Sequence, residues 1–259
     1  MCGTTAGLFW GAYLNLVGVA AHRTLRRDDD PSPSRPAGMR FRILVPAHDE
    51  EGTIDSALAS LAALDYPNDR FDVHVVADNC TDRTASVAQA RGVEVHERVD
   101  LDRRGKGAAL AWLIDQLPHG DDVFVVIDAD TVVDPGLLTE FERAFDDDTV
   151  ALQGHYMVKD AHTGGHVAFR AAALAVRHLV RPAGRTALGG SSSLYGNAMA
   201  FRESTARQYP WSTDLTEDLE MSLRVVLDGH RIGYAPEAIV EAEMPDSLDG
   251  AVTQNERWE

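Results

Sequence analysis

The sequence predicts an α/β fold in which a mainly parallel central sheet is flanked by helices. Two observations support this prediction. From about residue 41 onward, short apolar runs alternate with segments of helical periodicity, and three of the apolar runs are followed directly by polar residues. Alternation of strands and helices at this pitch is typical of βαβ units with right-handed crossovers. A chain of 259 residues is long enough for one such domain with a full core.

The expected elements follow one another in a regular order. The first apolar run, residues 42–46, predicts a buried strand, and apolar residues at helical spacing follow it between Glu50 and Leu64. The same alternation then predicts strands and helices over the next six segments. Strands are expected at 71–77, 93–97 and 122–127, and helices at 82–91, at 105–117 and from about Thr216.

The composition excludes several classes of protein. An apolar fraction of 44% excludes a disordered chain, and two cysteines without a Cys-x-x-Cys pattern exclude a disulfide scaffold. The net charge of −17 argues against a nucleic-acid binder, whose affinity depends largely on neutralising phosphates. This charge has two interpretations: a soluble surface, or carboxylates of which some are clustered around a divalent cation.

Residues 1–27 form an apolar N-terminal segment that is a candidate membrane anchor. No charged side chain precedes Arg23, and the apolar run 7–21 approaches the roughly 20 residues that a spanning helix needs. If this segment spans a membrane, the arginines after it keep the rest of the chain in the cytoplasm. A helix that packs on the core is the alternative. Residues 28–40, which are charged and rich in proline, are expected to form a linker.

Acidic clusters follow three of the predicted strands. Because the carboxyl ends of parallel strands meet at one edge of a sheet, and ligands bind outside that edge, these clusters are expected to converge there. Carboxylates held close together repel one another, and a divalent cation such as Mg²⁺ or Mn²⁺ relieves the repulsion. The clusters are His48-Asp-Glu-Glu51, Asp78-Asn-Cys-Thr-Asp82 and Asp128-Ala-Asp130.

Two further motifs carry candidate chemistry. Asp128 and Asp130 end a buried strand, where a side-chain period of two would point both carboxylates the same way. Arg103-Arg-Gly-Lys-Gly107 opens a predicted helix, so its backbone N–H groups and Lys106 could receive a diphosphate; a solvated basic turn is the alternative. The sequence has neither a P-loop here nor a dinucleotide-binding G-x-G-x-x-G after the first strand.

The last two motifs lie toward the end of the chain. Thr216-Glu217-Asp218 stands near the start of an amphipathic helix, where its carboxylates are either favoured by the helix dipole or include a general base. Gln254-Asn-Glu-Arg257-Trp258 pairs an aromatic ring, suited to the face of a sugar, with an arginine that can neutralise a diphosphate. A core-edge tryptophan is the alternative.

These motifs, taken in this order, resemble the family 2 inverting glycosyltransferases of the GT-A fold. The resemblance is to the membrane-associated branch that includes cellulose, chitin, hyaluronan and poly-N-acetylglucosamine synthases, and it implies a GT-A domain over residues 41–259. The matching stretches are 45–51 (Val-Pro-Ala-His-Asp-Glu-Glu), 75–82 (Val-Val-Ala-Asp-Asn-Cys-Thr-Asp), Arg104-Gly-Lys-Gly107, Asp128-Ala-Asp130, 196–201 (Gly-Asn-Ala-Met-Ala-Phe), Thr216-Glu-Asp218 and Gln254-Asn-Glu-Arg-Trp258.

The resemblance implies a role for individual residues. The domain would bind a nucleoside diphosphate sugar, most often a UDP-sugar, with Mg²⁺ or Mn²⁺, and pass the sugar to a hydroxyl acceptor by a single inverting displacement. Asp218 would be the general base with Glu217 beside it, and residues 189–197 would form a mobile loop on the acceptor side. The donor would be held by Pro46, Ala47, His48, Glu50, Asp78, Lys106 and Asp128, the metal by Asp130, and the diphosphate and acceptor by Gln254, Arg257 and Trp258.

Two departures from the family pattern leave alternatives open. The family often has Tyr-Asn where this chain has His48-Asp49, which affects the expected contacts with the base. Processive synthases continue into transmembrane helices after the last motif, whereas this sequence ends at Glu259. Either the gene product is short or the sequence is a fragment, and as given it cannot build a channel alone. A sugar-1-phosphate nucleotidyltransferase and a non-catalytic nucleotide-sugar-binding subunit are the alternative functions.

Overall fold

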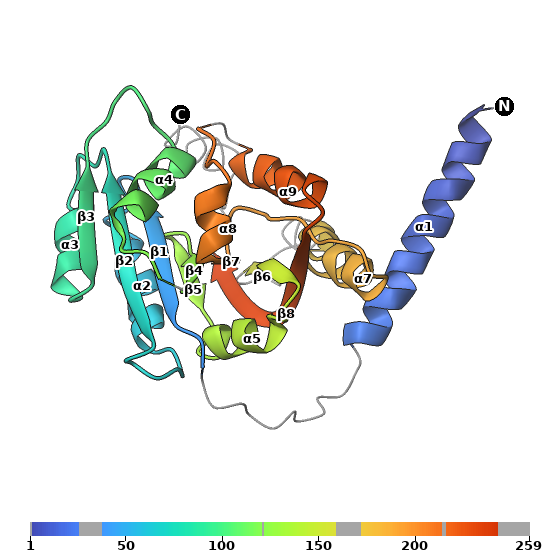
Figure 1. Ribbon diagram of the computed structural model, residues 1–259, viewed down its shortest axis with the longest axis horizontal. Coiled ribbons are helices and arrows are strands. Elements are labelled where there is room, and N and C mark those ends of the chain that lie inside the picture. The colour runs from blue at the N-terminus through green and yellow to red at the C-terminus, as the bar shows by residue number, and fades with distance from the viewer. Residues whose placement is uncertain (1, 26–37, 121, 159–171, 214–215, 243–259) are drawn as a thin grey trace.

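A single eight-stranded sheet organises the described part of the chain, with helices on both of its faces (Figure 1). The computed structural model describes residues 2–25, 38–120, 122–158, 172–213 and 216–242. The strands are β1 (Phe41–Ala47), β2 (Phe71–Asp78), β3 (Glu94–Arg98), β4 (Val123–Val126), β5 (Thr131–Val133), β6 (Thr149–Val158), β7 (Met199–Arg202) and β8 (Arg231–Ala242). The helices are α1 (Cys2–Leu25), α2 (Ile54–Ala62), α3 (Thr84–Ala90), α4 (Lys106–Gln116), α5 (Leu137–Ala144), the π-helix η1 (Val176–Val180), α7 (Arg181–Ala187), α8 (Glu203–Gln208) and α9 (Glu217–Leu227).

The first half of the sheet is parallel, as the alternating pattern predicts. β1 pairs in parallel with β2 and with β4, and β2 pairs in parallel with the edge strand β3. All four strands lie within two residues of their predicted positions. Their side chains are buried most completely in β1 and β4, which explains why these two strands read as continuous apolar runs.

The second half of the sheet is mixed. β7 is antiparallel to both of its neighbours, β4 and β6, while β6 and β8 are parallel and β5 is antiparallel to β8. The order across the sheet is β3-β2-β1-β4-β7-β6-β8-β5. The sheet therefore continues past β4 through strands that come from distant parts of the chain.

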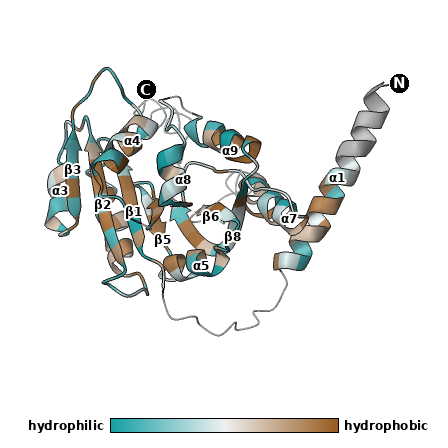
Figure 2. Cartoon of the chain, in the orientation of Figure 1, coloured by the Kyte–Doolittle hydropathy of each residue, from teal (hydrophilic) through white to brown (hydrophobic). Residues whose placement is uncertain are grey.

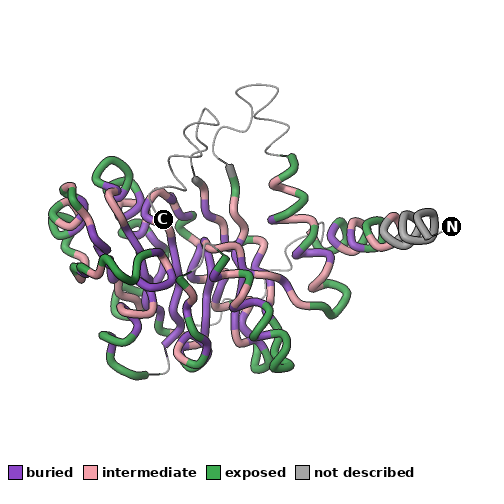
Figure 3. The backbone as a smooth tube through the Cα atoms, turned by 90° about the horizontal axis from the view of Figure 1, so that it is seen from above, coloured by how far each residue is buried: buried purple, intermediate pink, exposed green. Residues whose placement is uncertain are grey.

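Two apolar layers hold the helices against the sheet. On one face, α2 and α5 pack their apolar residues against alternate residues of β1 and β4. On the other face, α4 and α9 pack against the intervening residues, such as Leu44 and Phe124. Figure 2 shows apolar residues along the central strands, and Figure 3 shows the same strands buried beneath exposed loops and helix surfaces.

Helix α1 lies at one end of the molecule and contacts α7 (Figure 1). Val17 and Ala21 are buried in this contact, where a Cβ at Gly184 would lie only 2.2 Å from the carbonyl oxygen of Val17. Glycine is thus required for the close approach of the two helices. This contact agrees with the alternative of a packing helix. None of the described helices combines the length and the apolar character that a membrane crossing requires.

Candidate active site

The loops after β1 and β2 are joined by one aspartate. Asp49, whose backbone is left-handed (φ 53°), accepts hydrogen bonds from the backbone N–H of Thr81 at 2.7 Å and of Asp82 at 3.3 Å. Short polar side chains tolerate this backbone conformation. Two of the three acidic clusters predicted to converge at the sheet edge are therefore in direct contact.

The residues predicted to hold the donor's base and ribose lie at this joint. Pro46 and Ala47 end β1, and the Nδ1–H of His48 donates to the carbonyl oxygen of Asp78 at 2.6 Å. The carboxylate of Glu50 is buried and accepts a hydrogen bond from the Thr53 hydroxyl at 2.6 Å. The strand ends thus present hydrogen-bonded polar groups to a ligand.

Asp78 itself is held by a buried arginine. Its carboxylate is 2% exposed and accepts a hydrogen bond from Arg98, which also donates to Asp100 and to the carbonyl oxygen of Arg103. Burial raises the pKa of Asp78, although the Arg98 guanidinium opposes this change. Arg98 thereby connects β2 to the basic segment that precedes α4.

Lys106 is the central cation of the site. It is the first residue of α4, and its ammonium group donates to the carboxylate of Asp128 and, at 2.7 Å, to the carbonyl oxygen of Gly196. Burial lowers the pKa of Lys106, but attraction to Asp128, Glu217 and Asp130 outweighs burial and raises it. Lys106 is therefore charged at neutral pH and lies among acidic residues; its predicted role toward a diphosphate stays a prediction.

The glycines of the Lys106 segment have structural roles. Gly105 has a φ of 102°, a conformation that favours glycine, at the residue before α4. A Cβ at Gly107 would lie 1.8 Å from the carbonyl oxygen of Ser212 and 3.5 Å from the Cβ of Glu217. The absence of a side chain at Gly107 therefore lets α4 approach the segment that leads into α9.

Asp128 and Asp130 lie in a turn, and the prediction that they continue the strand is wrong. β4 ends at Val126, and the backbone N–H of Thr131 donates to the carbonyl oxygen of Asp128 at 3.2 Å. The buried side chain of Asn197 fixes this turn: its oxygen accepts from the Asp128 N–H, and its amide donates to the Thr131 hydroxyl at 2.7 Å. That hydroxyl donates to Asp130 at 3.3 Å.

Glu217 and Asp218 begin α9, as predicted, and lie beside the lysine. The preceding Thr216 makes no side-chain cap. A Cβ built at Gly196 would lie 3.7 Å from Asp218 Oδ2 and 3.9 Å from Lys106 Nζ, so both groups border the same glycine. Burial raises the pKa of Asp218 and also that of Glu217, against the opposing effect of Lys106. A raised pKa makes a carboxylate a stronger base.

The donor set at this turn suits a divalent cation. Burial, and next the charge of Asp128, raise the pKa of Asp130, so the free site carries an unfavourable concentration of negative charge. Oxygen ligands of this kind are the ones Mg²⁺ and Mn²⁺ prefer, and such sites are usually completed by substrate phosphates. Among the described residues, Asp128 and Asp130 belong to no group of three closely spaced protein ligands, so phosphate oxygens would have to complete the shell.

Several residues of this site were missed in the sequence. Tyr156 of β6 is near the turn: burial raises its pKa to about 12, and the charges of Asp130 and Asp128 add to the effect. Arg177 lies over the ring of Tyr195 at 5.7 Å, and its charge lowers the pKa of Asp218. Neither Tyr156 nor Arg177 belongs to a motif that could have identified it, whereas Asn197 lies in the matching stretch 196–201.

The segment 189–197, expected to be a mobile loop, is bonded to three elements. The backbone N–H groups of Ser192, Leu194 and Tyr195 donate to β8, α9 and β6, at 2.8, 2.8 and 2.9 Å respectively. These bonds give it a defined course past Lys106. The prediction that it moves remains a prediction.

The remaining predicted residues lie outside the described part of the chain. Gln254, Arg257 and Trp258 fall within 243–259, so their place relative to Lys106 is not part of the structure. Most of the linker predicted over residues 28–40 also lies outside the described residues, which begin again at residue 38.

The chain is similar in sequence to known glycosyltransferases over most of its length. The profile of the family described as "Glycosyltransferase like family 2" matches residues 37–259. The beta-monoglucosyldiacylglycerol synthase of Synechocystis sp. is 29% identical over 271 residues, which cover 96% of this chain and 56% of the synthase. The poly-beta-1,6-N-acetyl-D-glucosamine synthase of Staphylococcus aureus is 27% identical over 248 residues, or 91% of this chain and 57% of the relative. The chain thus spans little more than half the length of these relatives.

Solved structures confirm the predicted GT-A fold. The mannosyltransferase PcManGT of Pyrobaculum calidifontis, in complex with GDP-Man and Mn²⁺, has a TM-score of 0.69 at 20% identity, covering 95% of this chain and 68% of that one. TarS 1–349 of S. aureus, in complex with UDP-GlcNAc, has a TM-score of 0.59 at 17% identity, covering 82% and 61%. Since the family profile extends over nearly all of the chain after the N-terminal helix, this protein belongs to the glycosyltransferase-like family 2.

Proposed function

We propose that this domain transfers a sugar from a nucleoside diphosphate sugar, most often a UDP-sugar, to a hydroxyl acceptor with inversion at the anomeric carbon. The observation that carries the proposal is the position of Lys106. Its ammonium group lies between Asp128 and the Gly196 carbonyl, next to the carboxylates of Glu217 and Asp218. A cation to receive a diphosphate and a base to activate a hydroxyl are thus within one site.

The proposed reaction is a single displacement. The acceptor oxygen attacks the anomeric carbon, the bond from that carbon to the diphosphate oxygen breaks, and the acceptor's proton passes to Asp218. Burial raises the pKa of Asp218 and strengthens it as a base. Lys106 stabilises the negative charge that develops on the departing diphosphate. No covalent intermediate with the protein is needed.

A divalent cation fits the proposal. Asp130 would hold it, with Asp128 facing the nucleotide, and when bound it would supply additional positive charge for the leaving diphosphate. The complex of PcManGT with GDP-Man and Mn²⁺ supports this expectation. In the protein itself, the support is the raised pKa of the buried Asp130 carboxyl group.

For binding the donor and the acceptor, we propose the same residues that the sequence motifs indicate. The base and ribose would lie against Pro46, Ala47, His48, Glu50 and Asp78, where the first two strand ends meet. The acceptor is proposed to be a carbohydrate or lipid hydroxyl, since the curated relatives are named for a polysaccharide and a glycolipid. Gln254, Arg257 and Trp258 remain candidates for closing the site, and membrane contact through residues 7–21 remains a prediction.

The test is UDP release from a panel of UDP-sugars with acceptor, measured with and without Mn²⁺. We expect one donor to give metal-dependent transfer, and Asp218→Asn to lower kcat by about 10²–10⁴-fold, the range for removal of a general base. Asp69→Asn, at an exposed position, is the matched control.

Three results would contradict the proposal. Pyrophosphate exchange without sugar transfer would identify a nucleotidyltransferase, and nucleotide-sugar binding without turnover would identify a non-catalytic subunit. Full activity of Asp218→Asn would show that another group accepts the proton.

A further inference from the structure

A second cluster of ionisable residues lies away from the candidate active site, on the two strands at one edge of the sheet. His74 is on β2, and Glu94 and His96 are on the edge strand β3. In the parallel register His74 is opposite Glu94, and Val76 is opposite His96, so all three side chains are on one face. Asp78 is at the active-site end of β2. His74 lies four residues before it, which is a separation of about 13 Å along the strand.

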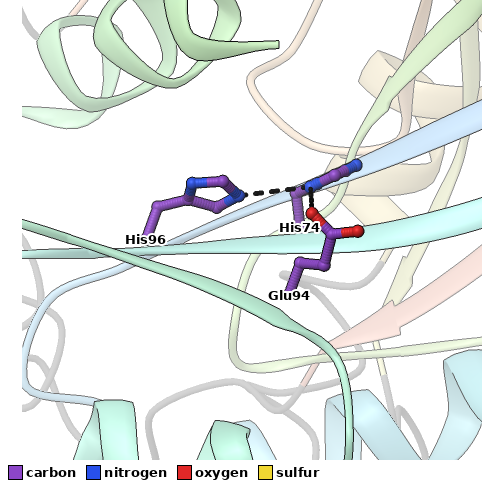
Figure 4. A group of neighbouring side chains, drawn as sticks. All are labelled: His74, Glu94 and His96. Carbon is purple, nitrogen blue, oxygen red and sulfur yellow. Dashed lines mark hydrogen bonds and ion pairs between the residues drawn. The ribbon is translucent and has the colours of Figure 1, made fainter.

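The three side chains converge on one point (Figure 4). His74 Nδ1 lies 3.2 Å from His96 Nε2 and 3.3 Å from Glu94 Oε2, and the ligand atoms of all three lie within 4.8 Å of one another. Two ligands of one tetrahedral zinc ion, each about 2.0–2.1 Å from the metal, are about 3.3 Å apart. The two contacts of His74 therefore have the spacing of a zinc shell.

The other nitrogen of His74 has the partner that a metal-bound histidine usually has. His74 Nε2 donates to Asp72 Oδ1 at 3.0 Å, and the second oxygen of Asp72 accepts from Arg40 at 2.7 Å. A carboxylate behind a histidine fixes the ring and leaves the opposite nitrogen free to bind a metal. Asp72 is thus placed to orient His74.

With the proton on Nε2, the Nδ1 lone pair of His74 faces the Glu94 carboxylate, and only the contact with His96 can be a hydrogen bond, donated by the His96 Nε2–H. No proton in this tautomer satisfies both contacts of Nδ1, whereas a metal ion serves all three groups. His74 is 4% exposed, but the Glu94 side chain is 68% exposed, so an ion can reach the cluster from solvent.

We propose that His74 Nδ1, His96 Nε2 and Glu94 bind a zinc ion, with Asp72 orienting His74 and water completing the shell. Two imidazoles and a carboxylate are a ligand set that zinc favours over magnesium. The bound ion joins β3 to β2 and so stabilises the edge of the sheet that carries Asp78. This site is distinct from the one proposed for the transferase metal at Asp130.

The test uses the whole 259-residue chain, freed of metal with a chelator and titrated with Zn²⁺ by calorimetry and with Co²⁺ by visible absorption. We expect one Zn²⁺ site that persists in Asp130→Asn and weakens at least tenfold in His96→Gln and in Glu94→Gln. Co²⁺ should show the intense visible bands of four-coordinate cobalt in wild type but not in His96→Gln. His230→Gln, at an exposed histidine, is the matched control.

Both ligand variants are chosen to keep the fold, because Glu94 and His96 lie on the edge strand and are less buried than His74. Equal Zn²⁺ affinity in wild type and His96→Gln would overturn the proposal, and so would zinc binding that disappears only in Asp130→Asn. Absence of any zinc site in wild type would also overturn it. Activity of the transferase enters none of these readouts.

Discussion

Arg177 is a residue whose effect on the site depends on its charge. It lies over Tyr195 and lowers the pKa of Asp218, whereas burial, the largest effect on that group, raises it. Removing the charge of Arg177 therefore allows the pKa of Asp218 to rise further. A base with a higher pKa is protonated, and so inactive, over a wider acidic range.

We expect Arg177→Gln to move the acidic limb of the kcat/KM profile to higher pH, so that activity falls more at pH 6 than at pH 8. The measurement is kcat/KM against pH with the donor found above. Arg177→Lys, which keeps the charge, should restore the position of the limb, and Arg224→Gln on the exposed side of α9 should leave it unchanged. An acidic limb that does not move in Arg177→Gln would show that Asp218 is not the group being titrated.

Some residues of the site could be predicted from sequence and others could not, for a physical reason. Lys106, Asp128, Glu217 and Asp218 are charged, stand at the ends of predictable elements, and were found together as expected. Asn197 lies in a stretch that matches the family, but its bonds to the turn, like the proximity of Tyr156, exist only once β6 and β7 pair beside β4. No local sequence pattern predicts this pairing of the strands.

At the scale of elements, the contact between α4 and the start of α9 controls the geometry of the site. Lys106 begins one helix and Glu217 the other, and Gly107 is where the first helix meets Ser212. The backbone oxygen of Ser212 cannot yield as a flexible side chain would. Any side chain at residue 107 must therefore separate the two helix ends.

We expect Gly107→Ala to lower kcat/KM by about 100-fold, because a displacement of about 1 Å at catalytic groups has an effect of that size. A loss of stability of about 1–3 kcal/mol from overpacking should accompany it. Steady-state kinetics and thermal unfolding measure the two effects. Gly52→Ala, where a Cβ meets nothing within 4 Å, is the control. Wild-type kinetics in Gly107→Ala would mean that the two helix ends need not approach so closely.

The elements differ in how well the sequence predicts them. β1 to β4 and the helices between them follow the alternation of apolar runs and helical periodicity, and were placed within a few residues. Asp128 and Asp130 were assigned to a strand end, but β4 ends at Val126 and the two residues lie in a turn that is held by Asn197. The antiparallel strand β7 and the long strands β6 and β8 depend on pairings between distant segments, which periodicity does not report.

At the scale of the whole molecule, the active site reduces the stability of the fold. Burial raises the pKa of Asp130, so folding disfavours its charged form. A carboxyl group of this kind binds more protons when folded than when unfolded, and stability is therefore lost as pH rises through the two pKa values. At neutral pH the charged Asp130 destabilises the domain.

Asp130→Asn is accordingly expected to raise the Tm at pH 7 while abolishing transfer. A gain of about 1 kcal/mol corresponds to roughly 2–4 °C for a domain of this size. The gain should shrink as the pH falls, and disappear below the pKa of an unfolded aspartate, about 3.9, where the wild-type group is protonated in both states. Asp147→Asn, at an exposed position, should change the Tm little at either pH. A lower Tm for Asp130→Asn in metal-free buffer would contradict this account.

The bond between Lys106 and Asp128 has a consequence for how the free protein meets its ligands. In the absence of donor Lys106 and Asp128 neutralise one another, so the proposed arrival of a diphosphate is an exchange of partners. Lys106 must turn toward the phosphates, and Asp128 is then left in need of another cation. Nucleotide and metal should therefore each bind more tightly when the other is present, by the same factor, as thermodynamic linkage requires.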